Sequence, residues 1–422
     1  MKAYKQLVAH VLENGTRYET NKGACIGVIG AQVTYDISQG LPIVTGKKTN
    51  ILWAIAEYAM FLKGITHVDF LRQYNGAEKI WEGQGLSQDL IVKDRNRNPV
   101  AVIEDYAKAT GIDLKEAETF FKERTEKYIA DRQLLDTNPP MKDDSPSTQI
   151  PLAEGGVEET TPAQIIDEEA YKAKLAELET FLISPFVEAG VRLLEDVVVK
   201  TKGDLGPIYG AQWRNWTAVG PNNRPIRIDQ LRDVVFKLKE NPESRQIIMH
   251  SWNPAAIVAE KFSYDEKINA GFMGQPPCHV NYHFLTRKNE QGEYVLNVVV
   301  WVRSNDLMLG HPFNAIGGAL ITHLVAKSCG FKVGTLTMQI SDAHIYENHV
   351  ENAKKYLEAE IFEQPSFELP DGIDVFNFEV EDIMNALGQY KHGPLIPFPL
   401  NINDNAMKEA AGEANESDSK QG

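Results

Sequence analysis

Cysteine is scarce in this chain of 422 residues, with three copies at positions 25, 278 and 329. An odd number of widely spaced cysteines fits neither a disulfide framework nor the paired spacing of a structural zinc site. The sequence also has no apolar run of 18 residues, and charges interrupt its first residues where a signal peptide would be apolar. We therefore expect a reducing, cytoplasmic location and no membrane partner.

Positive charge is in deficit, since 43 Lys and Arg residues face 59 Asp and Glu residues, for a formal net charge of -16. Nucleic-acid binding depends on clustered Lys and Arg that neutralise phosphates, so a polynucleotide partner is not expected. A small anion held in a local basic pocket remains compatible with this composition. The sequence has no glycine-rich dinucleotide motif, no P-loop and no internal repeat.

The first 82 residues have the pattern of a packed core. Apolar residues recur at helical spacing over residues 4–14 and alternate over residues 28–35, as expected of a helix followed by strands. Residues 51–62 predict a helix too apolar for a surface, and Glu57 lies inside it. A carboxylate in such a helix costs free energy unless it is paired or functional.

The composition changes between about residue 82 and residue 202. A charged helical stretch at 114–135 is followed by Pro, Ser, Thr and acidic residues, so we expect disorder or mobility over 137–162 and a charged helix over 168–194. The predicted division has four parts: a core part at 1–82, a charged, partly disordered insertion at 83–202, a catalytic core part at 203–402 and a flexible polar tail at 403–422.

Dense apolar and aromatic content returns after residue 203. The patterns predict a helix at 228–239 and strands at 245–250 and 294–302. Helices and strands alternate without a regular βαβ period. We therefore predict an α+β fold, with a mixed sheet packed by helices.

A cysteine between two prolines and a histidine is the first candidate for chemistry. Residues 275–279 read Gln-Pro-Pro-Cys-His, and Arg303 follows 25 residues after Cys278. A thiolate is the attacking form of cysteine, and a nearby Arg or His⁺ favours it. Cys278 is thus a candidate nucleophile. Taken alone, however, an inert core residue is the favoured interpretation, because free cysteine is among the most buried residue types.

Four ordered segments turn this candidate into a family resemblance. They are Gly-Asp-Leu-Gly-Pro-Ile-Tyr-Gly-Ala-Gln-Trp-Arg at 203–214, Pro-Cys-His at 277–279, Arg-Ser-Asn-Asp-Leu-Met-Leu-Gly-His-Pro-Phe-Asn at 303–314, and Asp-Ala-His-Ile-Tyr-Glu-Asn-His at 342–349. Together with residues 40–45 and 57–64 of the opening part, they resemble thymidylate synthase. The resemblance covers residues 1–81 and 203–401, which excludes the insertion and the tail.

The resemblance implies an α+β homodimeric methyltransferase of nucleotide biosynthesis that converts dUMP to dTMP. It implies 5,10-methylenetetrahydrofolate as carbon donor and reductant, and no metal. Uracil C5 is a poor nucleophile, but thiolate addition at C6 makes C5 able to attack an electrophilic carbon. Cys278 matches the residue that adds to C6.

The resemblance also assigns ligands of the nucleotide. Arg303 and Ser304 match phosphate ligands, and Arg303 would also favour the thiolate. Arg245 would reach the phosphate of the other subunit. The Asn314 amide, which both donates and accepts, suits the N3-H and O4 edge of uracil better than an aspartate would.

The motif near residue 344 has two interpretations. His344 and Tyr346 match the pair that holds the ribose 3′-hydroxyl. With His349 they could be mistaken for metal ligands, but the spacing lacks the i,i+4 His pair of a helical zinc site. We therefore expect no metal.

The remaining matches concern proton transfer and folate. Glu57 matches a glutamate that assists proton transfer through water, and its apolar helix would raise its pKa toward the working range; the alternative is a paired structural carboxylate. Tyr209 and His279 would order the catalytic segment. Asp306 would contact the pterin and act in catalysis. The apolar wall of the pterin site would comprise Trp81, Leu309, Gly310 and Phe313.

Several positions depart from the family pattern. An adjacent pair of arginines is reduced to Arg245 followed by Gln, and the loop at 20–24 keeps a single cation, Lys22. Each lost charge-assisted bond would weaken phosphate binding by about 1.5–3 kcal/mol if nothing replaces it. Lys22 and Lys48 are candidates to compensate. Val302 stands where a glutamine often precedes the phosphate arginine, and a second tryptophan is replaced near Gln84.

These departures leave two other functions open. In related hydroxymethylases water quenches the exocyclic methylene before hydride arrives, so exclusion of water decides the product. The Arg-Ser-Asn-Asp form at 303–306 and the polar tail favour dUMP hydroxymethylation, whereas Trp81 and Asn314 favour methylation of dUMP. An inactive nucleotide-binding relative, with an insertion that serves an assembly, is the third possibility.

Overall fold

The computed structural model describes residues 1–81, 83–87, 99–137, 140, 148–151, 157–160, 170, 173–178, 180–181, 184, 202–219 and 225–400. These residues form two compact units. Unit 1 holds the described residues of Met1–Gly85, Leu205–Arg214 and Asp229–Gly422, and unit 2 those of Leu86–Asp204 and Asn215–Ile228. All the predicted site residues belong to unit 1.

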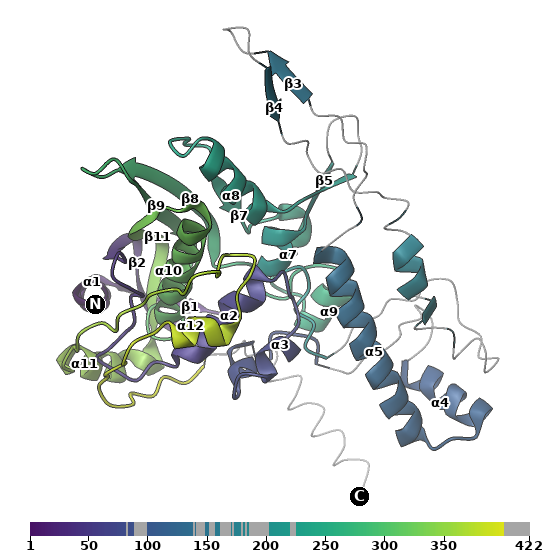
Figure 1. The fold of residues 1–422 in the computed structure, drawn as a ribbon. Helices are drawn as coiled ribbons and strands as arrows, with labels where there is room; N and C mark the ends of the chain where they lie inside the picture. Colours follow the sequence, from purple (N-terminus) through teal and green to yellow (C-terminus); the bar gives the residue numbers. More distant parts are fainter. Residues whose placement is uncertain are drawn as a thin grey trace, which may run out of the picture. The chain divides into compact units, whose positions relative to one another are not determined.

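A mixed sheet organises unit 1 (Figure 1). Its order is β1-β2-β11-β9-β8-β7, and β10 pairs with β11. The bounds are β1 Thr16–Thr20, β2 Gly23–Asp36, β7 Ile248–His250, β8 His279–Lys288, β9 Tyr294–Val302, β10 Asn305–Asp306 and β11 Lys332–Tyr346. The β9-β11 and β10-β11 pairs are parallel and the others antiparallel. The predicted α+β class is confirmed.

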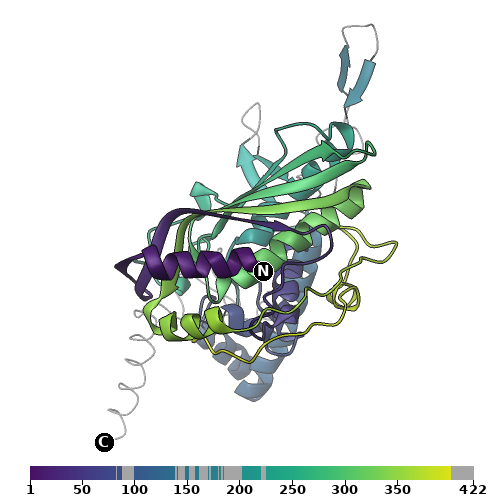
Figure 2. The same cartoon turned by 90° about the vertical axis from the view of Figure 1, so that its left-hand side faces the viewer.

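Helices cover one face of this sheet (Figures 1 and 2). Helix α1 (Lys2–Asn14) packs on β2 and β11, α10 (Gly310–Cys329) packs on β9 and β11, and α2 (Ile51–Leu62) packs on α10. Ten of the 12 residues of α2 and 14 of the 20 residues of α10 are buried, which explains why neither helix shows a wide polar stripe. Helix α10 ends at Gly330, whose φ of 71° is the left-handed conformation that glycine adopts without strain.

Shorter helices complete unit 1. They are α3 Asp69–Arg72, α7 Tyr209–Arg214, α8 Gln230–Glu240, α9 Tyr264–Asn269, α11 Val350–Glu358 and α12 Val380–Asn385, with 3₁₀ segments at Ala77–Trp81, Pro254–Ala256 and Glu347–His349. Figure 1 shows α12 beside α2. None of the helices that the structure describes is both long and apolar enough to cross a membrane.

The two faces of the sheet differ in burial. In β9 the side chains of Leu296, Val298, Val300 and Val302 are buried, and they alternate with Trp301, which is 43% exposed in the single chain. Trp301 Nε1 donates to Ser341 Oγ at 2.7 Å across the strands. The face that carries Trp301 is therefore the one that the described helices leave uncovered.

Unit 2 contains helices and two small hairpins. Its elements are α4 Pro99–Thr110, α5 Leu114–Thr137, a β3–β4 hairpin (Thr148–Pro151 with Val157–Thr160) and a β5–β6 hairpin (Trp216–Val219 with Pro225–Ile228). The Phe121 ring is fully buried and lies edge-on, 4.9 Å from the Tyr106 ring. This aromatic contact helps to pack α4 on α5.

The predicted elements are found with shifted ends. The predicted strand at 245–250 shortens to β7, and the predicted strand at 28–35 lengthens to β2. The β3–β4 hairpin lies inside the segment predicted to be disordered. The rest of that segment, most of the predicted helix at 168–194 and the tail at 403–422 lie outside the described residues.

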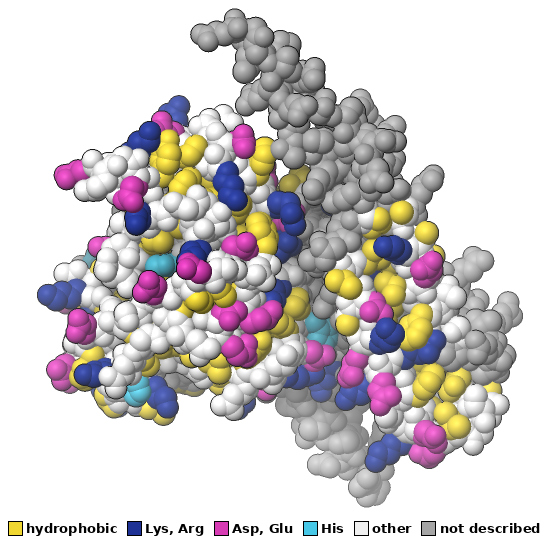
Figure 3. Space-filling model, in the orientation of Figure 1, with side chains coloured by type: hydrophobic (Ala, Val, Ile, Leu, Met, Phe, Trp, Pro, Cys, Tyr) yellow, Lys and Arg dark blue, Asp and Glu magenta, His cyan; other side chains and the backbone are white. Residues whose placement is uncertain are grey.

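Acidic and basic side chains are interspersed over the described residues on the face drawn in Figure 3. A track along a nucleic-acid backbone needs cations gathered on one stripe. The described part of this face has no such stripe.

Candidate active site

Two backbone hydrogen bonds hold the predicted nucleophile. Cys278 is half-buried and lies immediately before β8. Its N-H donates to the Tyr209 hydroxyl oxygen at 2.6 Å, and its carbonyl accepts from the Arg303 N-H at 2.9 Å. Because β8 pairs with β9 from His279 opposite Val302, residues 25 apart in sequence become neighbours.

The Arg303 guanidinium is oriented by the proline carbonyls before the cysteine. Its Nε donates to Pro277 O at 2.9 Å and its Nη2 to Pro276 O at 3.0 Å, and the group lies 5.5 Å from the Trp252 ring. An arginine side chain carries five N-H donors. Two of them fix the plane of the group here, so the others stay free to bind an anion.

Lys22 brings a second cation to the same place. It lies between β1 and β2, and burial lowers the pKa of its ammonium. The charges of Cys278 and Asp306 oppose this shift, whereas that of Arg303 adds to it. Lys22 therefore lies within electrostatic reach of three predicted site residues.

Glu57 and Trp81 form a buried pair. The indole Nε1 of Trp81 donates to Glu57 Oε1 at 2.9 Å. Burial raises the pKa of Glu57 to about 7, and the hydrogen bond from Trp81 opposes the shift because it favours the carboxylate. A carboxyl group with this pKa can both accept and donate a proton near neutral pH.

An aromatic cluster supports the catalytic segment. The His279 ring lies 5.0 Å from the Tyr209 ring and 5.8 Å from the Tyr58 ring. Burial lowers the pKa of His279 to about 4, while a hydrogen bond with Asn314 opposes the shift. The imidazole is therefore neutral at pH 7, and it joins Asn314 to the cluster that holds Cys278.

The turn after Arg303 is fixed by its own side chains. Asp306 Oδ1 accepts from the Met308 N-H at 2.9 Å and the Leu309 N-H at 3.3 Å. His311 Nδ1 lies 2.6 Å from Asn305 Oδ1, and its Nε2 lies 2.7 Å from the Tyr35 hydroxyl. Burial lowers the pKa of His311 to about 3, so this ring is a neutral link between the turn and β2.

The C-terminal end of β11, where it pairs with β2, carries the predicted ribose ligands. The rings of His344 and Tyr346 lie 5.2 Å apart, edge to face. Asp342 Oδ2 lies 3.3 Å from His344 Nδ1, and Asp342 also accepts from the Tyr18 hydroxyl at 2.8 Å. Burial raises the pKa of Tyr346, and the charges of Asp306 and Cys278 add to the shift. Tyr346 therefore lies within electrostatic reach of Asp306 and Cys278.

Three of the predicted folate residues lie close together in the sequence. Leu309, Gly310 and Phe313 are half-buried at the start of α10. A Cβ added at Gly310 would have Asn314 Nδ2 and Asp306 Cβ at 3.8 Å, so the missing side chain leaves space between two predicted ligands. Ser304 is also half-buried and follows Arg303 directly.

Arg245 is a predicted phosphate ligand that lies at the surface of the single chain. It is exposed before β7, where its carbonyl accepts from His283 Nε2 at 3.0 Å. Lys48 is exposed as well, and its backbone N-H donates to Pro394 O at 3.1 Å.

Lys47 is a residue that the sequence analysis did not single out. It is 6% exposed, its Nζ donates to Met308 O at 2.7 Å, and it lies 4.4 Å from the Phe398 ring. Burial lowers its pKa to about 8, against the attraction of Asp306. The signal available in the sequence was a lysine directly after the buried, apolar stretch at 41–46.

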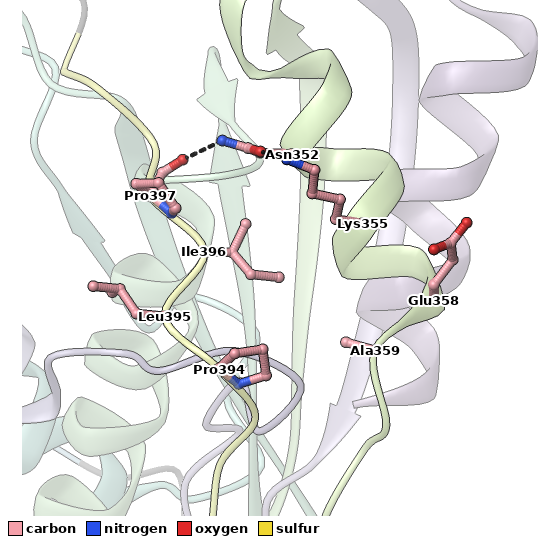
Figure 4. Close-up of a pocket in the computed structure, with 8 residues that line it drawn as sticks. All are labelled: Asn352, Lys355, Glu358, Ala359, Pro394, Leu395, Ile396 and Pro397. Atoms are coloured by element: carbon pink, nitrogen blue, oxygen red, sulfur yellow. Dashed lines mark hydrogen bonds between the residues drawn. The ribbon is translucent and has the colours of Figure 1, made fainter.

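A pocket of about 390 Å³ lies elsewhere in unit 1, between α11 and the C-terminal segment (Figure 4). Asn352 Nδ2 donates to Pro397 O across it at 2.8 Å. None of the predicted site residues lines it. A search of the described residues also finds no cluster of three His, Cys, Asp or Glu side chains that could hold a metal ion.

Comparisons with known proteins find a matching family and similar sequences. The family described as thymidylate synthase matches residues 2–402. A thymidylate synthase of Listeria monocytogenes serovar 1/2a is 31% identical over 406 residues, which covers 95% of this chain and 100% of the relative. A thymidylate synthase of Listeria innocua serovar 6a has the same identity and coverage, and one of Listeria monocytogenes serotype 4a is 30% identical.

Proposed function

The chain belongs to the thymidylate synthase family and is a transferase, and we propose that it converts dUMP to dTMP through a covalent bond between Cys278 and C6 of the base. The observation that carries this proposal is the arrangement around Cys278. Tyr209 and Arg303 hold its backbone on both sides, at 2.6 and 2.9 Å. Arg303 and Lys22 place positive charge beside it.

In this proposal Cys278 Sγ adds to C6 as the thiolate, which is the nucleophilic form of cysteine. The addition makes C5 nucleophilic. The co-substrate 5,10-methylenetetrahydrofolate supplies one carbon and the hydride. C5 attacks that carbon, loss of the C5 proton expels tetrahydrofolate by breaking the bond between the carbon and the folate nitrogen, and the hydride then adds to the resulting exocyclic methylene as the C6-S bond breaks and Cys278 leaves as thiolate.

Glu57 is the group that moves protons at the base in this scheme. Its pKa of about 7 places it close to the protonation midpoint at neutral pH. Burial beside Trp81 also keeps bulk water away from its carboxyl group. We assign Glu57 to proton transfer, through a water molecule, at the pyrimidine.

The nucleotide is held by residues from several elements. Asn314 pairs with the N3-H and O4 edge of uracil, with its amide oriented by neutral His279. His344 and Tyr346 take the ribose 3′-hydroxyl. Arg303, Ser304 and Lys22 bind the phosphate by charge-assisted and hydroxyl hydrogen bonds.

The folate site is built from the start of α10 and from Trp81. Trp81 presents an aromatic ring whose N-H already has a partner in Glu57, so the ring can stack on a pterin without losing that bond. Gly310 leaves room between Asp306 and Asn314, and the Asp306 carboxylate is anchored by two backbone N-H groups. Leu309 and Phe313 complete the apolar wall.

A homodimer completes the phosphate site in this proposal. Arg245 is exposed, and its carbonyl accepts from His283 Nε2. The sheet face that carries Trp301 also lacks a cover among the described helices. Pairing of two such faces would bury Trp301 and let the partner subunit's Arg245 reach the phosphate.

Hydroxymethylation of dUMP is the second candidate. Asn305 favours it, because the sequence Arg-Ser-Asn-Asp at 303–306 resembles the hydroxymethylase form. Methylation requires a site closed to water. The Phe398 ring lies 4.4 Å from the Lys47 ammonium and 5.3 Å from the His349 ring. Because Lys47 also donates to Met308 O, these contacts bring the C-terminal segment over the Asp306 turn. These contacts support methylation.

One assay separates these functions. The purified protein is incubated with dUMP and 5,10-methylenetetrahydrofolate, and product mass and dihydrofolate absorbance are recorded. A methyl product with dihydrofolate supports the proposal, and a hydroxymethyl product with tetrahydrofolate supports the second candidate. No product means a binding role.

The nucleophile is tested by Cys278→Ser. A serine hydroxyl is a far weaker nucleophile than a thiolate, so we expect kcat to fall by at least about a thousandfold. Cys329→Ser is the matched control, because Cys329 is also half-buried but packs on α8 through Val235. Mass spectrometry of the wild type with 5-fluoro-dUMP and folate should show a covalent adduct that Cys278→Ser lacks; its persistence in that variant would refute the assignment.

A further inference from the structure

A buried lysine lies in the segment that precedes Cys278 and has no part in the proposed mechanism. Lys267, in the last turn of α9, is 7% exposed. Its ammonium lies 5.4 Å from the centre of the Tyr264 ring, and within the described part of the chain no ion pair holds it. An ammonium taken out of water without a counter-charge is costly.

Contacts along this segment connect Lys267 to the wall of the candidate site. The Tyr264 hydroxyl donates to Gln275 Oε1 at 3.3 Å. The next two residues, Pro276 and Pro277, offer the carbonyls that orient Arg303. The chain from α9 to Cys278 is thus tied to the Arg303 guanidinium at one end and to Lys267 at the other.

The core holds this segment in place. Phe272 N-H donates to Lys267 O at 2.9 Å, Met273 N-H to Ala256 O at 2.8 Å, and Gly274 N-H to Leu205 O at 3.0 Å. A lysine fixed in this way presents its charge at a defined position, because the backbone around it has little freedom.

Lys267 and Lys22 act on each other. Burial lowers the pKa of both ammonium groups, and the charge of Lys22 lowers that of Lys267 further. The carboxylate of Glu260 attracts both. Two partly desolvated cations within electrostatic reach of each other destabilise the empty site, and a dianion between them would relieve the repulsion.

We propose that Lys267 is a specificity-determining residue that binds the 5′-phosphate of the nucleotide together with Lys22 and Arg303. This inference rests on the proposed function, since dUMP supplies the dianion. Lys22 feels the charge of Arg303, and Lys267 feels the charge of Lys22, so Lys22 links the two in electrostatic terms. The site would thereby recover positive charge that the Gln at 246 and the altered loop at 20–24 do not provide.

The test compares Lys267→Met, which keeps the apolar stem and removes the charge, with the wild type. We expect the KM for dUMP to rise about tenfold to a hundredfold, as for the loss of one charge-assisted bond, with a smaller change in kcat. Binding of deoxyuridine, which has no phosphate, should change less than twofold. Lys267→Arg should restore most of the affinity for dUMP.

Lys261→Met is the matched control, because Lys261 is exposed in the same segment and lies 5.1 Å from the Phe262 ring. Inorganic phosphate is the second probe. It should compete with dUMP on the wild type and on Lys261→Met, and about tenfold more weakly on Lys267→Met.

Three results would overturn the inference. One is an unchanged KM for dUMP in Lys267→Met. Another is an equal loss of deoxyuridine binding, which would indicate a general packing defect. The third is a rise confined to the KM for 5,10-methylenetetrahydrofolate, which would place Lys267 at the folate carboxylates. The 5-fluoro-dUMP adduct on wild-type protein tests the proposed function separately, since it forms at saturating nucleotide whatever Lys267 does.

Discussion

The protonation of Glu57 is set by two opposing effects on one side chain. Burial in α2 favours the neutral carboxylic acid, whereas the Trp81 indole N-H favours the carboxylate. Burial is the larger effect, so the pKa is about 7 rather than near that of an exposed glutamate. The indole that is proposed to stack on the pterin therefore also tunes the acid-base group.

Trp81→Phe should move the pKa of Glu57 upward. The substitution keeps an aromatic ring but removes the donor that stabilises the carboxylate, so the neutral form gains. The pH profile of kcat/KM should show its midpoint near pH 7 in the wild type and at higher pH in the variant. Trp53→Phe is the control. Trp53 lies on α2 like Glu57, but its Nε1 donates to Asn75 O at 3.2 Å and not to Glu57. Identical profiles for all three proteins would contradict the assignment.

At the scale of elements, α2 and α10 approach each other through a glycine. Gly317 of α10 lies against the Tyr58 ring of α2, and a Cβ at that position would overlap the ring. Tyr58 also stacks on His279, next to Cys278. The close approach of the two helices therefore sets the position of an aromatic side chain in the catalytic cluster.

Gly317→Ala should destabilise the fold by about 1–3 kcal/mol, because Tyr58 has to leave its rotamer in a packed core. Gly318→Ala is the matched control. There the added Cβ meets only Leu336 side-chain atoms at 3.2 Å, and alanine's higher helix propensity offsets the tighter contact. Urea denaturation measures both variants. Equal midpoints would show that Tyr58 moves without cost.

The pairing of β8 with β9 is the second element that the site depends on. It brings Arg303 to Cys278 and turns the proline carbonyls toward the guanidinium. A strand pair fixes these contacts more tightly than a loop would, because the ladder determines which residues face each other. The nucleophile and its cation are therefore held by the sheet itself.

At the scale of the whole molecule, buried histidines should control stability in acid. Burial lowers the pKa of His279 and His323 to about 4 and of His311 to about 3. Each stays neutral in the folded state down to these values, while the unfolded chain binds protons below about pH 6.5. Stability supplied by these three groups is therefore present above pH 6.5 and is lost as pH falls toward 4.

Glu57 acts in the opposite direction. Its folded pKa of about 7 exceeds the unfolded value of 4.5, so the folded state binds one extra proton between these limits. In this range the unfolded chain binds three histidine protons that the folded protein lacks, and the folded protein binds one proton on Glu57 that the unfolded chain lacks. In net terms the unfolded state therefore binds two more protons. The free energy of unfolding should fall by about 3 kcal/mol per pH unit between about pH 6.5 and 4.5.

Urea midpoints measured across this range test the acid prediction. His323→Gln, which removes one buried imidazole, lowers the net proton difference from two to one and should reduce the slope by about one half. His10→Gln should leave it unchanged, because His10 is exposed on α1. A flat profile for the wild type would contradict the buried, neutral state of these rings.

Dimerisation is tested on the sheet face that the described helices leave uncovered. Trp301→Glu adds a charge at a side chain that is 43% exposed in the single chain, so a monomer would tolerate it. A buried, unpaired carboxylate in a dimer would not be tolerated, and the dimer should dissociate with a loss of activity. Sedimentation velocity measures the mass. Leu395→Glu, at a 71% exposed leucine near α11, is the control.

Wild-type protein that sediments as a monomer, or a Trp301→Glu variant with unchanged mass and kcat/KM, would rule out this interface. Mixing inactive Cys278→Ser with Arg245→Ala subunits gives a further readout. Activity should return on mixing if Arg245 acts in the site of the partner subunit, because some hybrid sites then hold both residues.

The sequence by itself determined what depends on local order along the chain. Apolar periodicity placed α1, α2, α8 and β9, and the ordered motifs identified Cys278, Arg303 and Asn314 as candidates. The tertiary structure decided what depends on desolvation and on strand pairing, which bring together residues far apart in the chain. Only there do Trp81 and Glu57 become partners, and Lys22, Lys47 and Lys267 become buried cations. No periodicity predicts such pairs, because their energy depends on the solvent that folding removes.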